Sequence, residues 1–170
     1  MAKSSSSRSD PARARDGGGR DFSATTAMPG HLLRRCQQIA VSLFHQECRG
    51  LDLTPVQFVI LSALDHHGAL DQARLGGLTA LDRTTVGVVL DKLEARGLID
   101  RRRSTTDRRA NLITRTAKGR RLLAQAVPAV EAAQARILAP LSAAEQRRFL
   151  AALHRIADEN NQQSRAPLRP

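Results

Sequence analysis

The sequence predicts a mainly α-helical chain that carries one small β-hairpin. Hydrophobic residues make up 41% of the 170 residues but aromatic residues only 2%, so the core must be built from Leu, Ala, Val and Ile. Apolar positions recur at about 100° per residue in most segments, which is the period of a helix. Two short β-branched or apolar stretches on either side of a basic segment are the exception, and they are typical of a hairpin.

The ends of the chain differ in composition from its middle. Residues 1–28 are rich in Ser, Gly and Arg and lack apolar periodicity, so we expect a disordered N-terminal tail. Residues 161–170 are polar and contain proline, which predicts a flexible C-terminal tail. A single domain is therefore expected over residues 29–160. Its first helix, about residues 30–48, has Leu33, Ile39 and Leu43 on one side.

The middle of the chain shows clear helix start and stop signals. Thr54 followed by Pro55 starts a second helix, which ends at Gly68. A short helix over about residues 71–77 comes next, and Asp82 then caps a longer helix that ends at Gly97. This order, a short helix, a tight turn and a longer helix, is typical of a helix-turn-helix.

A hairpin and two further helices complete the prediction. The apolar stretches at residues 98–99 and 111–114 flank the segment RRRSTTDRRA, which predicts a hairpin with a cationic tip. Thr116 caps a long helix that Pro128 kinks, and the capping box at residues 142–145 starts the last helix. We place a winged helix-turn-helix at about residues 52–116, and expect the helices at about 30–48 and 116–160 to mediate dimerisation.

The charge distribution points to a polyanionic partner. The chain has 27 Lys and Arg against 16 Asp and Glu, a net charge of +11. Residues 96–121 alone contain ten basic and two acidic residues, a net charge of +8, and they coincide with the predicted hairpin. A basic hairpin directly after a helix-turn-helix indicates double-stranded DNA, with the second helix in the major groove and the wing along the minor groove.

The candidate DNA-binding residues come from this second helix and the wing. Arg83 has the geometry to read guanine, and Gly87 is expected to let the helix approach the DNA closely. Thr84 and Thr85 supply hydroxyls, although extended capping of their helix is the plainer interpretation. The full candidate set is Arg83, Thr84, Thr85, Gly87, Val88, Lys92, Arg101, Arg103, Arg108 and Arg109.

At these residues the sequence resembles a known family. The stretches LDRTTVGVVLDKLEARGLIDR and STTDRRANLITRTAKG are similar to the MarR family of bacterial transcription regulators, with LEARGL closing the recognition helix and DRR in the wing. PGHLLRRCQQI and LDHHGALDQA are most similar to the NicR/BpsR type, repressors linked to nicotinate degradation. The resemblance implies an obligate dimer that represses transcription and releases DNA when a small aromatic acid binds between the dimerisation helices and the DNA-binding lobe.

Dimerisation is also expected from packing. The Leu-, Ala- and Val-rich helices after Thr116 present more apolar surface than one winged domain can cover, so they need a second copy of the chain. A two-fold dimer is expected to read an inverted repeat whose half-sites lie about one helical turn apart.

A set of polar residues is the candidate effector site. Histidines and an arginine line one side of the first helix, and a histidine pair ends the second helix; the plainer interpretation is a solvated helix face. The resemblance favours a site for a hydroxylated pyridine carboxylate such as 6-hydroxynicotinate, with an arginine supplying the positive charge. The candidates are His31, Arg34, Arg35, Gln38, His45, His66 and His67.

Other functions are weaker interpretations of the sequence. We find no phosphate-binding loop, dinucleotide fingerprint or nucleophile elbow, so no enzyme is predicted and no cofactor or metal is expected. A nonspecific architectural DNA- or RNA-binding protein remains an alternative, as does a metal- or redox-sensing regulator. We expect Cys36 to be a small core residue and Cys48, beside Arg49, to be the more reactive cysteine.

Overall fold

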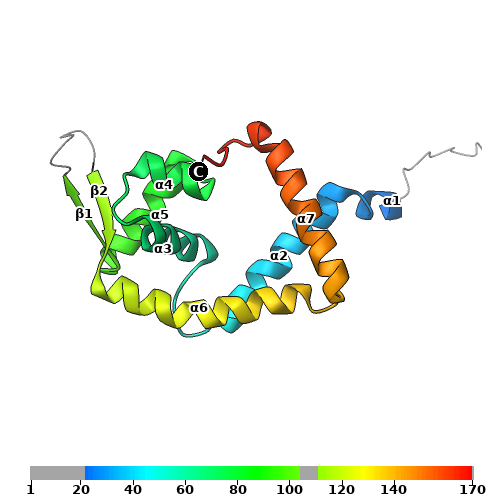
Figure 1. Ribbon diagram of the computed structural model, residues 1–170, viewed down its shortest axis with the longest axis horizontal. Coiled ribbons are helices and arrows are strands. Elements are labelled where there is room, and N and C mark those ends of the chain that lie inside the picture. Colours follow the sequence, from blue (N-terminus) through cyan, green and yellow to red (C-terminus); the bar gives the residue numbers. More distant parts are fainter. Residues whose placement is uncertain (1–21, 104–110, 170) are drawn as a thin grey trace, which may run out of the picture. The chain divides into compact units, whose positions relative to one another are not determined.

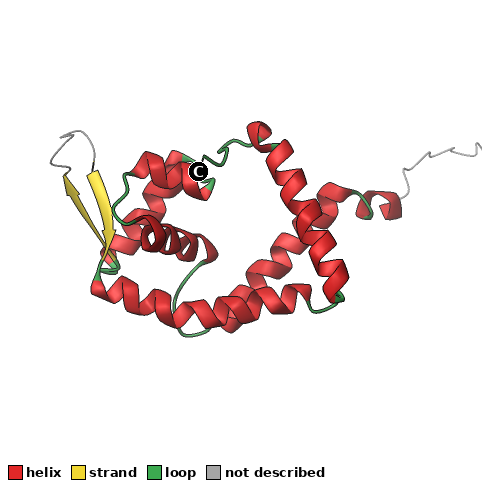
Figure 2. Ribbon diagram, in the orientation of Figure 1, coloured by secondary structure: helices red, strands yellow, loops and turns green. Residues whose placement is uncertain are grey.

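The computed structural model describes residues 22–103 and 111–169, which form helices and one antiparallel hairpin (Figures 1 and 2). The elements are α1 (Phe22–Thr26), α2 (Pro29–Glu47), α3 (Pro55–His67), α4 (Gln72–Thr79), α5 (Arg83–Ala95), β1 (Ile99–Arg103), β2 (Asn111–Arg115), α6 (Ala117–Leu138), α7 (Ala143–Glu159) and the 3₁₀ helix η1 (Asn161–Gln163). The predicted fold class is thus confirmed. Across the described ranges, every helix is too short or too polar to cross a membrane.

The chain divides into two compact units, Met1–Arg35 and Cys36–Pro170, which are described separately. In the first unit the N–H of Leu32 donates to the carbonyl of Met28 just after the short helix α1. The sequence predicted disorder as far as residue 28, whereas helical structure already begins at Phe22. The earlier part of the predicted tail lies outside the described residues.

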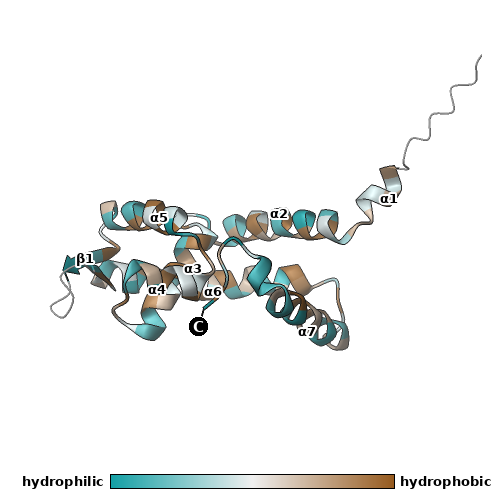
Figure 3. Ribbon diagram, turned by 90° about the horizontal axis from the view of Figure 1, so that it is seen from above, coloured by the Kyte–Doolittle hydropathy of each residue, from teal (hydrophilic) through white to brown (hydrophobic). Residues whose placement is uncertain are grey.

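The core of the second unit is aliphatic, as the composition predicted. Ten fully buried side chains from α3, α4, α5, the hairpin and the residue before it form its centre: Ile60, Leu61, Leu64, Leu75, Val86, Leu90, Leu93, Leu98, Ile99 and Ile113. Burying one such side chain contributes about 1.5–3 kcal/mol to folding. Figure 3 shows hydrophobic and hydrophilic residues interleaved along α5, as this one-sided burial requires.

All four helix N-caps that the sequence predicted in the second unit are confirmed. Thr54 and Gln57 form a reciprocal capping box at α3, and Ser142 with Glu145 forms another at α7. Asp82 caps α5, and Thr116 caps α6. These interactions join residues three apart in the chain, so the local sequence is sufficient to specify them.

The hairpin pairs further than its apolar residues suggested. The register runs from Ile99 opposite Arg115 to Arg103 opposite Asn111, because backbone pairing continues through the arginines of β1. Leu70 adds an isolated bridge that sequence reasoning missed: its carbonyl accepts the N–H of Ile113 at 2.7 Å. The hairpin is therefore held to the segment that precedes α4.

Candidate nucleic-acid interface

The N-terminus of α5 is built around Asp82. Its Oδ1 accepts the backbone N–H of Thr85 at 3.0 Å, and its Oδ2 accepts the Thr85 hydroxyl at 2.8 Å. These two bonds, together with the nearby Arg165 guanidinium, hold the pKa of the Asp82 carboxyl below its usual value. Thr85 thus uses its hydroxyl for capping, which is the plainer of the two roles that the sequence allowed.

The opposite sides of α5 have different tasks. Val86, Leu90 and Leu93 are fully buried, while Thr84 and Lys92 are exposed and Val88 is 50% exposed. Thr84, Val88 and Lys92 are spaced four residues apart and so share one face of the helix. Arg83, also exposed, begins the same helix. This face has the short and hydrogen-bonding side chains that a major groove accommodates.

Gly87 has a different neighbour from the one expected. A Cβ added at this position would lie 3.4 Å from Nε2 of Gln72 on α4, and the same Nε2 donates to the carbonyl of Arg83 at 3.0 Å. A side chain at this position would thus contact the Gln72 amide that links α4 to α5. The expectation that Gly87 serves the approach to DNA stays a prediction beside this contact.

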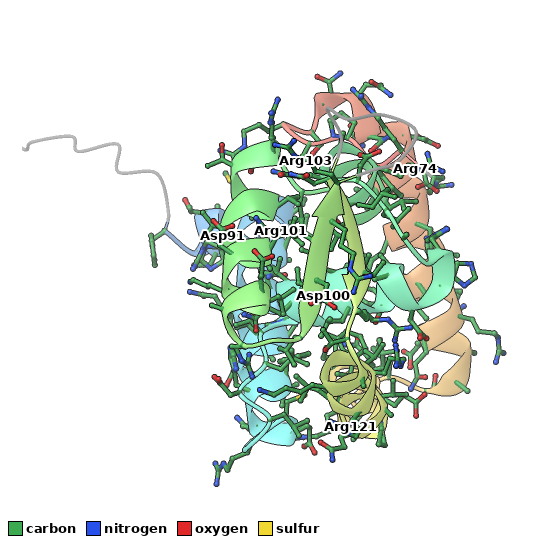
Figure 4. All side chains as sticks on the ribbon, turned by 90° about the vertical axis from the view of Figure 1, so that its left-hand side faces the viewer. Arg74, Asp91, Asp100, Arg101, Arg103 and Arg121 are labelled. Atoms are coloured by element: carbon green, nitrogen blue, oxygen red, sulfur yellow. The ribbon has the colours of Figure 1, made fainter. Side chains whose placement is uncertain are left out.

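The first wing strand is bound to the recognition helix through Arg101. Its Nη2 lies 2.6 Å from Oδ1 of Asp91, its Nε lies 3.4 Å from Oε2 of Glu94, and its side chain is only 25% exposed (Figure 4). Two acidic residues one turn apart on α5 thus pair with this guanidinium within the chain, and its predicted DNA contact stays a prediction. Arg103 is exposed at the end of β1, as expected, and Arg108 and Arg109 lie outside the described residues.

Other members of the basic run have structural partners. Arg96 donates to the carbonyl oxygens of Leu51 and Asp52 and forms an ion pair with the Asp52 carboxylate at 3.3 Å. Nζ of Lys118 donates to the carbonyl of Arg96 at 2.8 Å. The ion pair with Asp52 therefore partly offsets the charge of Arg96, whereas Lys118, which donates to a neutral carbonyl, keeps its full charge.

A small cavity beside Arg115 is a feature that the sequence analysis missed. Its volume is about 160 Å³, and Asp65, Arg115, Arg120 and Val127 are among its lining residues. Arg115 forms an ion pair with Asp65, and its Nε is buried without a hydrogen-bond partner in the described structure. The signal was the period of two along β2, which puts Arg115 on the same face as the buried Ile113.

Comparison with known proteins decides the identity. The MarR family profile matches residues 53–111. The HTH-type transcriptional repressor NicR of Pseudomonas putida is 33% identical over 135 residues, which cover 79% of this chain and 85% of NicR. The chain belongs to the MarR family. It is thus a transcriptional repressor of the MarR type, and its relatives confirm the prediction that it is not an enzyme.

Solved MarR-family structures have the same fold. Bordetella bronchiseptica BpsR, studied for the regulation of its DNA binding by 6-hydroxynicotinic acid, is 35% identical, with a TM-score of 0.75 over 78% of this chain and 95% of BpsR. The repressor CouR, bound to a 23-mer DNA duplex, is 31% identical, with a TM-score of 0.74 over 80% of this chain and 96% of CouR. The predicted winged helix-turn-helix architecture is therefore confirmed.

The candidate effector residues of this MarR-family chain lie on α2 and α3. In the first unit, His31 is half-buried and both Arg34 and Arg35 are exposed. In the second unit, Gln38 and His45 continue α2. His66 and His67 end α3, exposed and with ring centroids 4.6 Å apart. The His45 ring contacts Phe44, and none of the ring contacts within the described ranges joins it to the pair on α3.

The two cysteines are placed opposite to expectation. Cys36 is exposed, whereas Cys48 is 4% exposed and packs in the core with Phe44. Burial, followed by the negative charge of Glu47, raises the pKa of the Cys48 thiol, so the residue that we considered more reactive is the less reactive type. Across the described ranges, no three His, Cys, Asp or Glu side chains gather as metal ligands would.

Proposed function

We propose that two copies of this chain form a repressor that binds an inverted-repeat operator and releases it when a small aromatic acid binds. The observation that carries the DNA-binding part is the exposed face of α5, with Thr84, Val88 and Lys92 opposite a fully buried face. The wing strand β1 is fixed to that helix by Arg101, so helix and wing meet DNA as one body. The CouR complex with a DNA duplex supports the same use of the fold here.

The dimer is proposed on the basis of exposed apolar side chains. In the second unit these lie on the parts of the chain assigned to dimerisation, namely Ile39 on α2, Val127 on α6, and Phe149, Leu150 and Ile156 on α7. Side chains of this size leave water favourably when a second copy covers them. A two-fold axis then spaces the two recognition helices for successive turns of the major groove.

The effector that we propose is a hydroxylated pyridine carboxylate of the 6-hydroxynicotinate kind. BpsR, whose DNA binding is regulated by that acid, is 35% identical to this chain. The cavity beside Arg115 offers cationic and apolar walls in the form of Arg120, Leu123 and Val127, and suits a carboxylate on a flat ring. His66 directly follows Asp65, a lining residue of this cavity. Gln38 and His45 on α2, which belong to the same unit, are further candidates for contact with the acid.

Release requires the acid to prefer the form of the dimer that does not fit the operator. Each 1.4 kcal/mol of this preference weakens DNA binding about tenfold. An acid with equal affinity for both forms would leave DNA binding unchanged, however tightly it bound. The α6 helix, which lines the cavity and directly follows the wing strand β2, is the element that we propose to transmit the change.

The test combines footprinting with competition. The purified protein is expected to protect a discrete near-palindrome in its own promoter region, and 6-hydroxynicotinate is expected to abolish the shift of that fragment in a gel. Arg120→Ala is expected to reduce the response to the acid while leaving operator binding intact. The adjacent Arg121→Ala, which is also exposed but lies outside the cavity lining, is the matched control.

Three results would contradict the proposal in different places. Equal affinity for the operator and a scrambled duplex would favour the nonspecific architectural alternative. A monomer in light scattering would contradict the dimer. If the protein shifts the operator fragment but no hydroxylated aromatic acid relieves that shift, the proposed repression would still stand, and the proposed effector would be contradicted.

A further inference from the structure

The C-terminal segment, residues 161–169, is folded rather than free. Nδ2 of Asn161 donates to the carbonyl of Leu168 at 3.0 Å, and its Oδ1 accepts the N–H of Leu168 at 2.8 Å. One side chain thus satisfies both backbone groups of a residue seven positions later and closes the segment into a loop. The sequence predicted a flexible tail here, and this long-range clamp is the reason for the difference.

This loop is attached to the helix-turn-helix at two points. The backbone N–H of Arg169 donates to the carbonyl of Gly77 near the end of α4 at 2.8 Å, and in Figure 1 the C-terminus lies beside α4. A Cβ added at Gly77 would lie only 3.1 Å from the Cβ of Arg169, so the glycine makes room for the segment. At the second point, Nη2 of Arg165 lies 2.7 Å from Oδ2 of Asp82, the cap of α5.

The loop brings positive charge to the start of the recognition helix. Residues 161–170 contain two arginines and no acidic residue. The Arg165 side chain is 85% exposed, and the contact with Asp82 leaves most of the five N–H donors of its guanidinium available. Arg165 and Arg169 line one groove of about 670 Å³ together with Arg83, the first residue of α5.

We propose that Arg165 and Arg169 bind phosphates of the DNA backbone and extend the interface beyond the helix and the wing. This inference rests on the proposed operator binding. In a helix-turn-helix, the N-terminal residues of the second helix meet base edges while the first helix crosses the backbone. Cations held at the end of α4 and at the cap of α5 therefore lie beside a phosphate strand. Phosphate contacts carry no base preference, so the contribution of these arginines to DNA affinity is expected to be the same on every DNA sequence.

The experiment measures how affinity depends on salt for the full chain on an operator duplex and on a scrambled duplex. Each phosphate contact contributes about 0.9 to the slope of log affinity against log salt concentration. The variant Arg165→Ala with Arg169→Ala is expected to lower that slope by about 1.8 on both duplexes, while the operator remains preferred. The double Lys variant at the same positions is expected to restore the slope, since lysine also neutralises phosphate.

A control variant removes the same charge elsewhere. Arg147→Ala with Arg148→Ala takes two exposed arginines from α7, and its slope is expected to stay near that of the wild type. Light scattering and thermal melting verify that each variant remains folded in its native assembly.

The outcomes separate this inference from the proposed function. An unchanged slope with a lowered melting temperature would show that the segment only braces the fold, and would overturn the inference. Loss of operator preference in the Ala variant, with folding intact, would overturn it too, because a phosphate contact cannot carry that preference. Absence of operator preference in the wild type would instead contradict the proposed function.

Discussion

The guanidinium of Arg101 and the carboxylate of Asp91 lie 2.6 Å apart, one on the first wing strand and the other on the recognition helix. Oε2 of Glu94, one turn further along the helix, forms a second ion pair with Nε of the same guanidinium at 3.4 Å. The Arg101 side chain therefore links the wing strand to the recognition helix. This pair joins the two elements that we propose to contact DNA.

Replacement of Arg101 by Ala tests this positioning role. Partial exposure limits the contribution of the pair, so the free energy of unfolding is expected to fall by only about 1 kcal/mol. DNA affinity is expected to fall while its salt dependence stays nearly constant, because no phosphate contact is lost. The matched variant Arg103→Ala removes an exposed cation of the same strand and is expected to lower the salt slope by about 0.9. Equal slopes for the two variants would show that Arg101 leaves Asp91 to bind DNA.

Gly119→Ala is expected to destabilise the fold. A Cβ at this position would overlap the carbonyl oxygen of Leu98, and that oxygen also accepts the N–H of Thr116 at 3.1 Å. Because the backbone must move, we expect a loss of about 1–3 kcal/mol in urea unfolding. Gly30→Ala is the control, since nothing lies within 4 Å of its added Cβ, and its stability is expected to change little. A loss for Gly119→Ala no larger than that of the control would contradict the packing described here.

The Asp82 cap predicts a pH dependence of stability. Hydrogen bonds from Thr85 and the charge of Arg165 lower the pKa of Asp82 in the folded state. The contribution of this cap to the free energy of unfolding is fully present above the unfolded-state pKa of about 4. It is lost as the pH falls through the lower folded-state pKa. Asp82→Asn keeps a capping oxygen but does not titrate. The difference in melting temperature between wild type and variant is therefore expected to shrink from pH 5 downwards, and a constant difference would contradict this origin.

Cys48 is expected to be chemically protected in the native protein. Its burial in the core raises the pKa of the thiol, so little thiolate is available at neutral pH. In the Cys36→Ser variant, Cys48 is the one remaining thiol. A disulfide reagent is expected to modify it at the rate of unfolding and to react fast only in denaturant. Rapid modification without denaturant would show that this part of the core opens readily.

Local features of this fold were predictable from the sequence, and long-range partners were not. The caps at Thr54, Asp82, Thr116 and Ser142 depend on residues three positions away, so a short stretch of sequence contains all that specifies them. The buried positions of α5 follow in the same way from the helical period.

The partners of the candidate residues could not be predicted for one physical reason. The sequence shows the charge of an arginine but not its partner, so the ion pair between Arg101 and Asp91 appears only once the fold brings the two residues together. The helical period similarly placed Cys36 on the apolar side of its helix, but it could not show whether a neighbouring element covers that side. In the structure Cys36 is exposed. The clamp between Asn161 and Leu168 involves polar residues that give no periodic signal at all.

The contact between Gly119 and the Leu98 carbonyl also connects the hairpin rigidly to α6. That oxygen accepts the N–H of Thr116, the Thr116 hydroxyl donates to the carbonyl of Gly97, and Gly119 packs against it without an intervening side chain. The base of the hairpin and the first turn of α6 are thus connected by direct hydrogen bonds and backbone packing. A rotation of α6 is therefore expected to move the hairpin β1–β2 with it.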